Sequence, residues 1–166
     1  MTKFETNKVQ WKMDSLVGPI YLVSSQKGLQ SVLLEEQDIP FAAYLDSEEP
    51  EIKILKSAVK ELEEYFRGER KSFSVPLDTE GTSFQKRVWN ALLQIPYGKT
   101  CSYQDIALKI KNTKAMRAVG NANGKNPLCI IVPCHRVIAS NGALGGYSGG
   151  IEVKKKLLAL EQKESL

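Results

Sequence analysis

The chain has 166 residues, which is enough for one large domain or for two small domains that share an interface. Its composition, 42% hydrophobic and 25% charged, is that of an ordinary globular protein, and no apolar run approaches the roughly 20 residues that a membrane-spanning helix needs. The N-terminal segment also lacks the apolar core of a secretion signal. These features exclude membrane and secreted classes, and we expect a cytoplasmic protein, or a nuclear one in a eukaryote.

The net charge of +4 is unevenly distributed along the chain. Residues 1–80 carry ten Lys/Arg and fifteen Asp/Glu, a net charge of −5, whereas residues 81–166 carry thirteen Lys/Arg and four Asp/Glu, a net charge of +9. This split predicts an acidic supporting half and a basic half that faces a polyanion. Uneven solubilising charge would explain the same numbers equally well.

Cysteine and histidine usage gives no sign of a metal or a disulfide framework. An odd cysteine count without a secretion signal argues against paired cysteines. The three cysteines and one histidine contain no C-x-x-C pair, so they are a poor set of zinc ligands. Two glycine-containing stretches, 98–100 and 142–150, do not match the order of a phosphate-binding loop or a dinucleotide site. We therefore expect neither a metal nor a cofactor. The cysteines and the single histidine are Cys101, Cys129, Cys134 and His135.

The first third of the chain predicts three strands and one covering helix. The strands are expected at 9–16, 19–25 and 28–34, because turn residues separate these runs. A helix is expected within 46–70, ending at Gly68. Its apolar residues recur at spacings of three and four, which places them on one helical face: Ile52, Leu55, Val59, Leu62 and Phe66.

Two capping-box patterns predict helices in the second half. Thr82 with Gln85 predicts a helix from about Ser83, which Pro96-Tyr97-Gly98 ends. Ser102 with Asp105 predicts a second helix through about Ile110.

A third helix is expected to be capped by Thr113 and to end at Gly124, with Met116, Val119 and Ala122 facing a core. The second and third helices together suggest a helix-turn-helix. Basic residues without a nearby carboxylate favour nucleic-acid binding by this motif. They are Lys109, Lys111, Lys114, Arg117 and Lys125.

The remaining segments complete an α/β (α+β) fold. Residues 129–132 predict a short buried strand, the glycine-rich residues 141–150 a loop, and residues 151–162 a helix. That helix is expected to place Val153, Leu157 and Leu160 on one side. We expect a small sheet-and-helix N-terminal supporting domain over 1–76 and a mainly helical C-terminal domain with the helix-turn-helix over 77–166.

Cys134 is the candidate reactive residue. It follows an apolar run and a proline, lies beside the only histidine and precedes Arg136. A thiol reacts as the thiolate, and a neighbouring imidazole or cation lowers its pKa from about 8.5. Isolated cysteines more often only fill space in a core, so these neighbours alone do not decide the question.

The longer sequence around Cys134 resembles the O6-alkylguanine–DNA alkyltransferases, or methylated-DNA–protein-cysteine methyltransferases. The resemblance covers about residues 82–161, is much weaker before them, and consists of blocks in the family's order: FQKRVWNALLQIPYGKTCSYQDIA, RAVGNANGKNP, IIVPCHRVI, GGYSGG and LALE. It implies repair of double-stranded DNA by single, irreversible transfer of the alkyl group of O6-alkylguanine to Cys134. The helix-turn-helix would flip the damaged base.

The resemblance also implies roles for individual residues. Cys134 would accept the alkyl group, His135 would take the thiol proton through a water molecule, and Glu161 would hold the imidazole. Asn126 would brace the turn before the active segment. Tyr103 would help to rotate the target phosphate and donate a proton toward the leaving purine.

Further residues would bind the DNA and the flipped base. Arg117 matches the arginine that fills the gap in the duplex, and Lys154 matches a lysine near the site. Lys114 and Lys125 belong to the basic helices. The base pocket would be lined by the Val137 carbonyl, Tyr147 and Ser148. Members that bind zinc use N-terminal cysteines and histidines, which this chain lacks.

Several alternatives remain open on the residues alone. Asn126-Pro127 is also a common turn, Tyr103 could be an ordinary helix aromatic, and Glu161 could be an ordinary solvated helix residue. A DNA-binding regulator with a redox-sensing Cys134 and a cysteine hydrolase are the competing functions. The sequence leaves open the repair of O4-alkylthymine and cooperative binding of the expected monomer along DNA.

Overall fold

The structure, a computed structural model, describes residues 7–163. Its contacts divide the chain into two units, residues 1–80 and 81–166, each described here by itself. None of the helices within 7–163 is long and apolar enough to cross a membrane.

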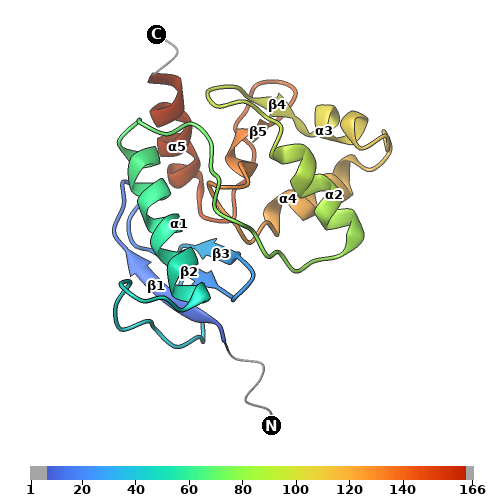
Figure 1. The fold of residues 1–166 in the computed structure, drawn as a ribbon. Coiled ribbons are helices and arrows are strands. Elements are labelled where there is room, and N and C mark those ends of the chain that lie inside the picture. The colour runs from blue at the N-terminus through green and yellow to red at the C-terminus, as the bar shows by residue number, and fades with distance from the viewer. Residues whose placement is uncertain (1–6, 164–166) are drawn as a thin grey trace. The chain divides into compact units, whose positions relative to one another are not determined.

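The first unit is an antiparallel sheet with one helix packed on it (Figure 1). The strands β1 (Val9–Met13), β2 (Ile20–Ser24) and β3 (Leu29–Leu33) pair in sequence order, as the turn signals predict. Helix α1 (Pro50–Phe66) begins at a proline, whose fixed φ suits a first helical position. It ends before Gly68, which has a φ of 77° and so confirms the predicted stop.

The buried face of α1 differs slightly from the predicted one. Ala58 and Tyr65 are buried, while the predicted Val59 and Phe66 are only half-buried. The chain then returns beside β3, where Leu29 and Leu77 form a parallel bridge. Gly28 permits this approach, because a Cβ atom there would lie 2.8 Å from the Leu77 backbone.

The second unit begins with two helices that start as predicted. Both capping boxes are present, at Thr82 before α2 (Ser83–Leu92) and at Ser102 before α3 (Tyr103–Lys109). The Trp89 indole donates a hydrogen bond of 2.9 Å to the Ala122 carbonyl and so ties α2 to α4 (Met116–Gly124). The helices enclose a core that includes Val88, Leu92, Ile106, Ala107, Val119 and Leu128.

The predicted start of the third helix is wrong. Thr113 does not cap α4, which begins only after Ala115 and has no side-chain cap. The chain turns first at Lys111, in a left-handed conformation with a φ of 60°, and Ala115 then donates to the Asn112 carbonyl. This extra turn also leaves Met116 47% exposed instead of facing the core.

The predicted strand at 129–132 is also wrong, although these residues are buried. They form turns in which Ile130 has a φ of 76° and the Val132 amide donates to the Leu128 carbonyl. A short apolar run is compatible with any buried backbone, so periodicity could not distinguish a strand from a buried turn. The turns lead into the 3-10 turn Cys134–Arg136.

The last helix, α5 (Ile151–Lys163), is present, and residues 141–150 form the predicted loop without helix or strand. The helix buries a different stripe from the predicted one, because Val153 and Leu160 are only half-buried. The buried positions have spacings of three, one and three and include two charged residues: Lys154, Leu157, Leu158 and Glu161.

Candidate active site

A two-residue strand pair brings the start of the helix-turn-helix beside the segment of Cys134. Strand β4 (Cys101–Ser102) pairs in parallel with β5 (Val137–Ile138). Tyr103 follows β4 directly, and β5 follows the 3-10 turn directly. The pairing therefore places the N-terminus of α3 next to the candidate nucleophile.

Two buried asparagines hold the turn around Cys134. The Asn126 amide donates a hydrogen bond of 2.8 Å to the Val132 carbonyl, and its oxygen accepts one of 2.9 Å from the Leu128 amide. Asn123 donates to the Cys134 carbonyl at 3.4 Å. Asn126 therefore bonds to the turn that precedes Cys134, and Asn123 adds a contact to Cys134 itself.

The Cys134 thiol is only 1% exposed and hydrogen-bonds with the Cys129 thiol. This contact and burial raise the pKa of Cys134 well above its usual value, while Asn126 and the Lys154 charge act in the opposite direction. The expectation of a lowered pKa is therefore wrong for the resting protein. A thiol that stays protonated at rest needs a proton acceptor when it reacts.

His135 and Glu161 form a buried pair, and both side chains are fully buried. The imidazole Nε2 lies 2.6 Å from Glu161 Oε2, and because a carboxylate only accepts, Nε2 carries the hydrogen. Burial lowers the pKa of His135 although Glu161 acts to raise it, so the ring is neutral at pH 7. Nδ1 then carries the free lone pair, and it has no hydrogen-bond partner within residues 7–163.

Arg136 does not face Cys134, contrary to its expected action as a cation beside the thiol. Its guanidinium donates two hydrogen bonds to Glu161, of 2.8 and 3.0 Å, and one of 2.7 Å to the Ile95 carbonyl. Burial alone would raise the pKa of Glu161, but the hydrogen bonds and charges of His135 and Arg136 lower it to about 2. Glu161 is therefore a carboxylate and not a solvated helix residue.

Lys154 is the cation whose charge acts on Cys134, and it is fully buried. Its ammonium group donates to the carbonyls of Val137, at 2.7 Å, and of Leu144 and Gly146 in the glycine-rich loop. Lys154 thus joins α5, β5 and this loop. Burial lowers the pKa of Lys154, and Cys134 opposes that shift.

The glycine-rich loop approaches both cysteines and Tyr103. The hydroxyls of Tyr147 and Ser148 hydrogen-bond with the Cys129 thiol. Gly145 has a φ of 73°, and a Cβ atom there would lie 3.2 Å from the Tyr103 hydroxyl. A glycine therefore meets both the backbone conformation and the space at this position.

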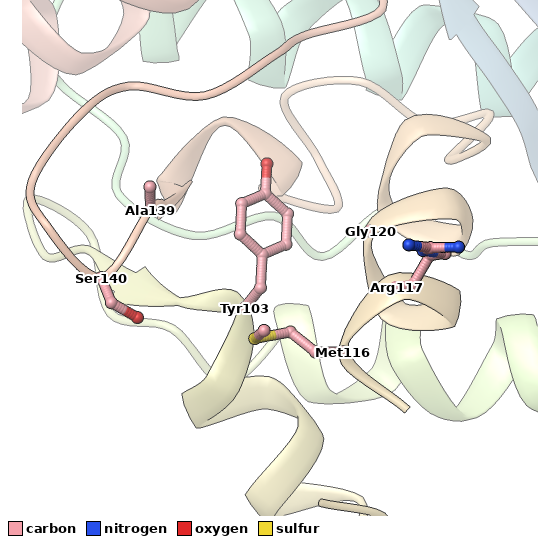
Figure 2. A pocket seen from close by; sticks show the side chains of 6 residues that line it. All are labelled: Tyr103, Met116, Arg117, Gly120, Ala139 and Ser140. Carbon is pink, nitrogen blue, oxygen red and sulfur yellow. The ribbon is translucent and has the colours of Figure 1, made fainter. Parts of the chain in front are cut away.

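An open pocket of about 420 Å³ lies beside these elements. Figure 2 shows the Tyr103 ring standing between residues of α4 and the segment after β5. Burial raises the pKa of Tyr103, and the charge that Cys134 carries as a thiolate adds to this shift. The pocket is lined by Tyr103, Met116, Arg117, Gly120, Ala139 and Ser140.

Solvent-exposed basic residues lie on α3, on α4, between these helices and just after α4, and exposure leaves their charges available to a polyanion. They are Lys109, Lys111, Lys114, Arg117 and Lys125. Of these residues Arg117 lines the pocket, whereas Lys109 and Lys111 line a separate one. Among residues 7–163, no three His, Cys, Asp or Glu side chains are grouped so that they could hold a metal ion.

Sequence reasoning missed three contributors to this site. No role was predicted for Asn123, Cys129 was placed in a buried strand, and Arg136 was given the wrong partner. Only Arg136 carried a signal, because a buried arginine needs a carboxylate and few remain in the second half of the chain.

Comparison with known proteins covers both units. Residues 9–79 match the 6-O-methylguanine DNA methyltransferase, ribonuclease-like domain, and residues 83–163 match its DNA binding domain. A methylated-DNA–protein-cysteine methyltransferase of Methanosarcina acetivorans is 49% identical over 89% of this chain and 94% of its own length. The Mycobacterium bovis protein of the same name is 47% identical over 92% of each chain.

Solved structures give the same result. A crystal structure of Mycobacterium tuberculosis OGT in complex with DNA has a TM-score of 0.82 and 45% identity, over 93% of this chain and 92% of that one. Two family domains that together span most of the chain, and relatives that match it nearly end to end, leave one assignment. The chain belongs to the 6-O-methylguanine DNA methyltransferase family.

Proposed function

We propose that this protein repairs alkylated DNA by direct reversal and that Cys134 accepts the alkyl group from O6-alkylguanine. Family membership makes it a methylated-DNA–protein-cysteine methyltransferase. One observation carries the assignment to Cys134: the thiol precedes a neutral His135 whose Nε2 is fixed by Glu161 and whose Nδ1 lone pair is unused. That is the arrangement of an acceptor for the thiol proton.

The transfer then follows from these residues. The Cys134 proton passes to His135 Nδ1, through a water molecule as in the family, and Glu161 stabilises the imidazolium that forms. The thiolate attacks the alkyl carbon in line, the C–S bond forms and the bond from that carbon to O6 breaks. Tyr103 donates a proton toward the departing guanine. The proton that His135 took from the thiol replaces it, so that overall one proton moves from Cys134 to the guanine. The product is a thioether on Cys134.

DNA is the partner, and the helix-turn-helix is the element that would bind it. Base flipping costs a few kcal/mol, which phosphate contacts and a side chain inserted into the vacated stack can offset. Arg117 on α4 is the candidate for insertion, and Lys114 and Lys125 are candidates for phosphate contacts, since all three are exposed.

The flipped base would meet the Val137 carbonyl, Tyr147 and Ser148. Lys154 donates to the Val137 oxygen, and a carbonyl oxygen can accept a second hydrogen bond, here from a guanine donor. Its contacts to the glycine-rich loop would hold Tyr147 and Ser148 in place. Both hydroxyls act on the thiol of Cys129, which in turn acts on the reactive thiol of Cys134.

A thioether has no evident route back to the thiol here, so one molecule repairs one lesion. We propose that it acts as a monomer, in the cytoplasm of a bacterial or archaeal cell such as those of its relatives. The same pocket chemistry leaves O4-alkylthymine as a second substrate to be assayed.

The test is transfer of a labelled methyl group from a duplex with one O6-methylguanine. Cys134→Ala should abolish transfer and leave duplex affinity nearly unchanged, because phosphate contacts dominate binding. Cys101→Ala is the matched control. Burial raises the pKa of the Cys101 thiol to about 11, so this thiol is not expected to react and the variant should transfer the methyl group at the wild-type rate. Transfer by Cys134→Ala would refute the assignment.

A further inference from the structure

The Arg136 side chain is buried and makes several polar contacts, more than are needed for a residue that only packs in the core. Its side chain is 6% exposed, and it makes two hydrogen bonds to Glu161 and one to the Ile95 carbonyl. The guanidinium also lies 5.7 Å from the centre of the Tyr97 ring. Each of the three guanidinium nitrogens therefore donates a hydrogen bond, and two of these bonds engage both Glu161 oxygens.

Glu161 is shared between two donors. Oε2 accepts from His135 at 2.6 Å and from Arg136 at 3.0 Å, while Oε1 accepts from Arg136 at 2.8 Å. A buried carboxylate that faced His135 alone would draw a proton onto the imidazole and form an imidazolium–carboxylate pair. A permanent positive charge from the guanidinium satisfies the carboxylate without that proton.

We propose that Arg136 is a positioning residue that keeps His135 neutral, so that Nδ1 is free to take the Cys134 proton. This inference rests on the proposed function, because a neutral His135 matters only if His135 takes the Cys134 proton during transfer. An imidazolium at rest has no lone pair on Nδ1 and could not accept the thiol proton. Arg136 therefore acts on the transfer through Glu161 and His135, without contact with the alkylated base.

The charged groups around His135 agree with this direction. Glu161 on α5 favours the imidazolium, whereas Arg136 and Lys154 disfavour it. Cys134 precedes His135 in the chain, and its thiol is protonated at rest. Burial is the largest influence that lowers the pKa of His135, and the two cations add to it. Removal of Arg136 takes away one of these two charges and releases both carboxylate oxygens to His135.

The titration of His135 tests the proposal directly, because this is the only histidine in the chain. A nuclear magnetic resonance titration of the labelled imidazole in the full-length protein should show a neutral ring at pH 7. In Arg136→Gln, the pKa of His135 should rise by about one unit or more, the size expected for a nearby charge. Arg70→Gln is the matched control, since Arg70 also binds a carboxylate, Glu64 at 2.8 Å, and it should leave the titration unchanged.

Transfer rates give the second readout. The rate should fall as the pH drops through the pKa of His135, so Arg136→Gln should lose activity at a higher pH than the wild type and recover at alkaline pH. A merely structural role would lower the rate equally at every pH. In a Glu161→Gln background, the Arg136→Gln change should raise the pKa of His135 by a smaller amount, since the carboxylate is gone and only the direct effect of the guanidinium charge remains.

An unchanged or lowered pKa of His135 in Arg136→Gln would overturn the proposal. If that variant does not fold, Arg136→Lys decides, because it keeps one charge and loses the fork. It should raise the pKa by a smaller amount, and no rise would again overturn the proposal. Failure of the proposed function is distinct: the wild type would then not methylate Cys134 at any pH, whatever His135 does.

Discussion

Two sets of charged residues in the second unit act in opposite environments. Those beside Cys134 are buried, and each has fixed partners: His135, Glu161, Arg136 and Lys154. Those of the helix-turn-helix, from Lys109 to Lys125, are exposed. Buried charges are little screened by salt and influence proton transfer through geometry, whereas exposed charges bind a polyanion by releasing counterions. Chemistry and DNA affinity should therefore respond to different mutations and to different solution conditions.

The largest effect should come from the buried set. Glu161→Gln removes the negative charge that stabilises the imidazolium and leaves His135 at best a neutral acceptor, so single-turnover transfer should fall by about 10²- to 10³-fold. It also leaves Arg136 buried without its carboxylate, which should cost about 3–5 kcal/mol of unfolding free energy. Duplex affinity should stay the same. Equal losses of affinity and rate would contradict the separation of the two sets.

Arg117→Ala should give the next largest effect, and only on paired DNA. If Arg117 fills the vacated stack, duplex repair should slow by about 10- to 100-fold, because a few kcal/mol of unstacking are no longer offset. The loss should shrink for a mismatched or single-stranded lesion and vanish for the free base. Single-turnover transfer at saturating protein measures all of these, and an equal loss on every substrate would assign Arg117 to the chemistry or the fold.

Lys125→Ala should have a smaller effect that is uniform over substrates. The loss of one phosphate contact should weaken binding of every duplex alike and reduce the slope of log K against log salt by about 0.9. The transfer rate at saturating protein should not change. Lys114→Ala is the parallel test on the turn before α4, and a changed saturated rate for either variant would show that the lysine acts beyond phosphate binding.

The stability of the protein at acid pH should depend on Glu161 and His135 of the buried set. Glu161 has a pKa of about 2 in the folded protein against an ordinary 4.5, so its contribution, about 3 kcal/mol, is complete above pH 4.5 and is lost as the pH falls toward 2. His135 has a lowered pKa, so unfolding already becomes easier below about pH 6.5. Denaturant titrations of the wild type and Glu161→Gln over this range would show whether the carboxylate is the cause.

Metal removal should have no effect. Exhaustive chelation is expected to change neither the melting temperature nor the transfer rate. Stoichiometric zinc that is lost together with activity would contradict this expectation.

The features predicted correctly from sequence are those that depend on neighbours in the chain. The capping boxes at Thr82 and Ser102 involve residues three positions apart, so the local pattern was sufficient. Thr113 has the right residue type, but the left-handed turn at Lys111 moves the start of α4 past it. Nothing in the side chain of a lysine indicates that conformation.

The geometry of the site depends on contacts that sequence spacing does not contain. Cys134, His135 and Arg136 are adjacent, but a 3-10 turn has three residues per turn, so consecutive side chains point in different directions. Arg136 therefore meets Glu161 instead of the thiol. Glu161 and Lys154 are charged residues of a helix, and such residues are usually exposed to solvent. Their burial becomes evident only when α5 packs against the 3-10 turn that contains Cys134.

The most direct measurement is the intact mass of the protein after incubation with excess duplex that contains one O6-methylguanine, followed by peptide mapping. The protein should gain the mass of one methyl group, on Cys134, and then stop reacting however much duplex remains. Continued turnover, or a methyl group on Cys101 or Cys129, would contradict the assignment of Cys134 as the single, irreversible acceptor.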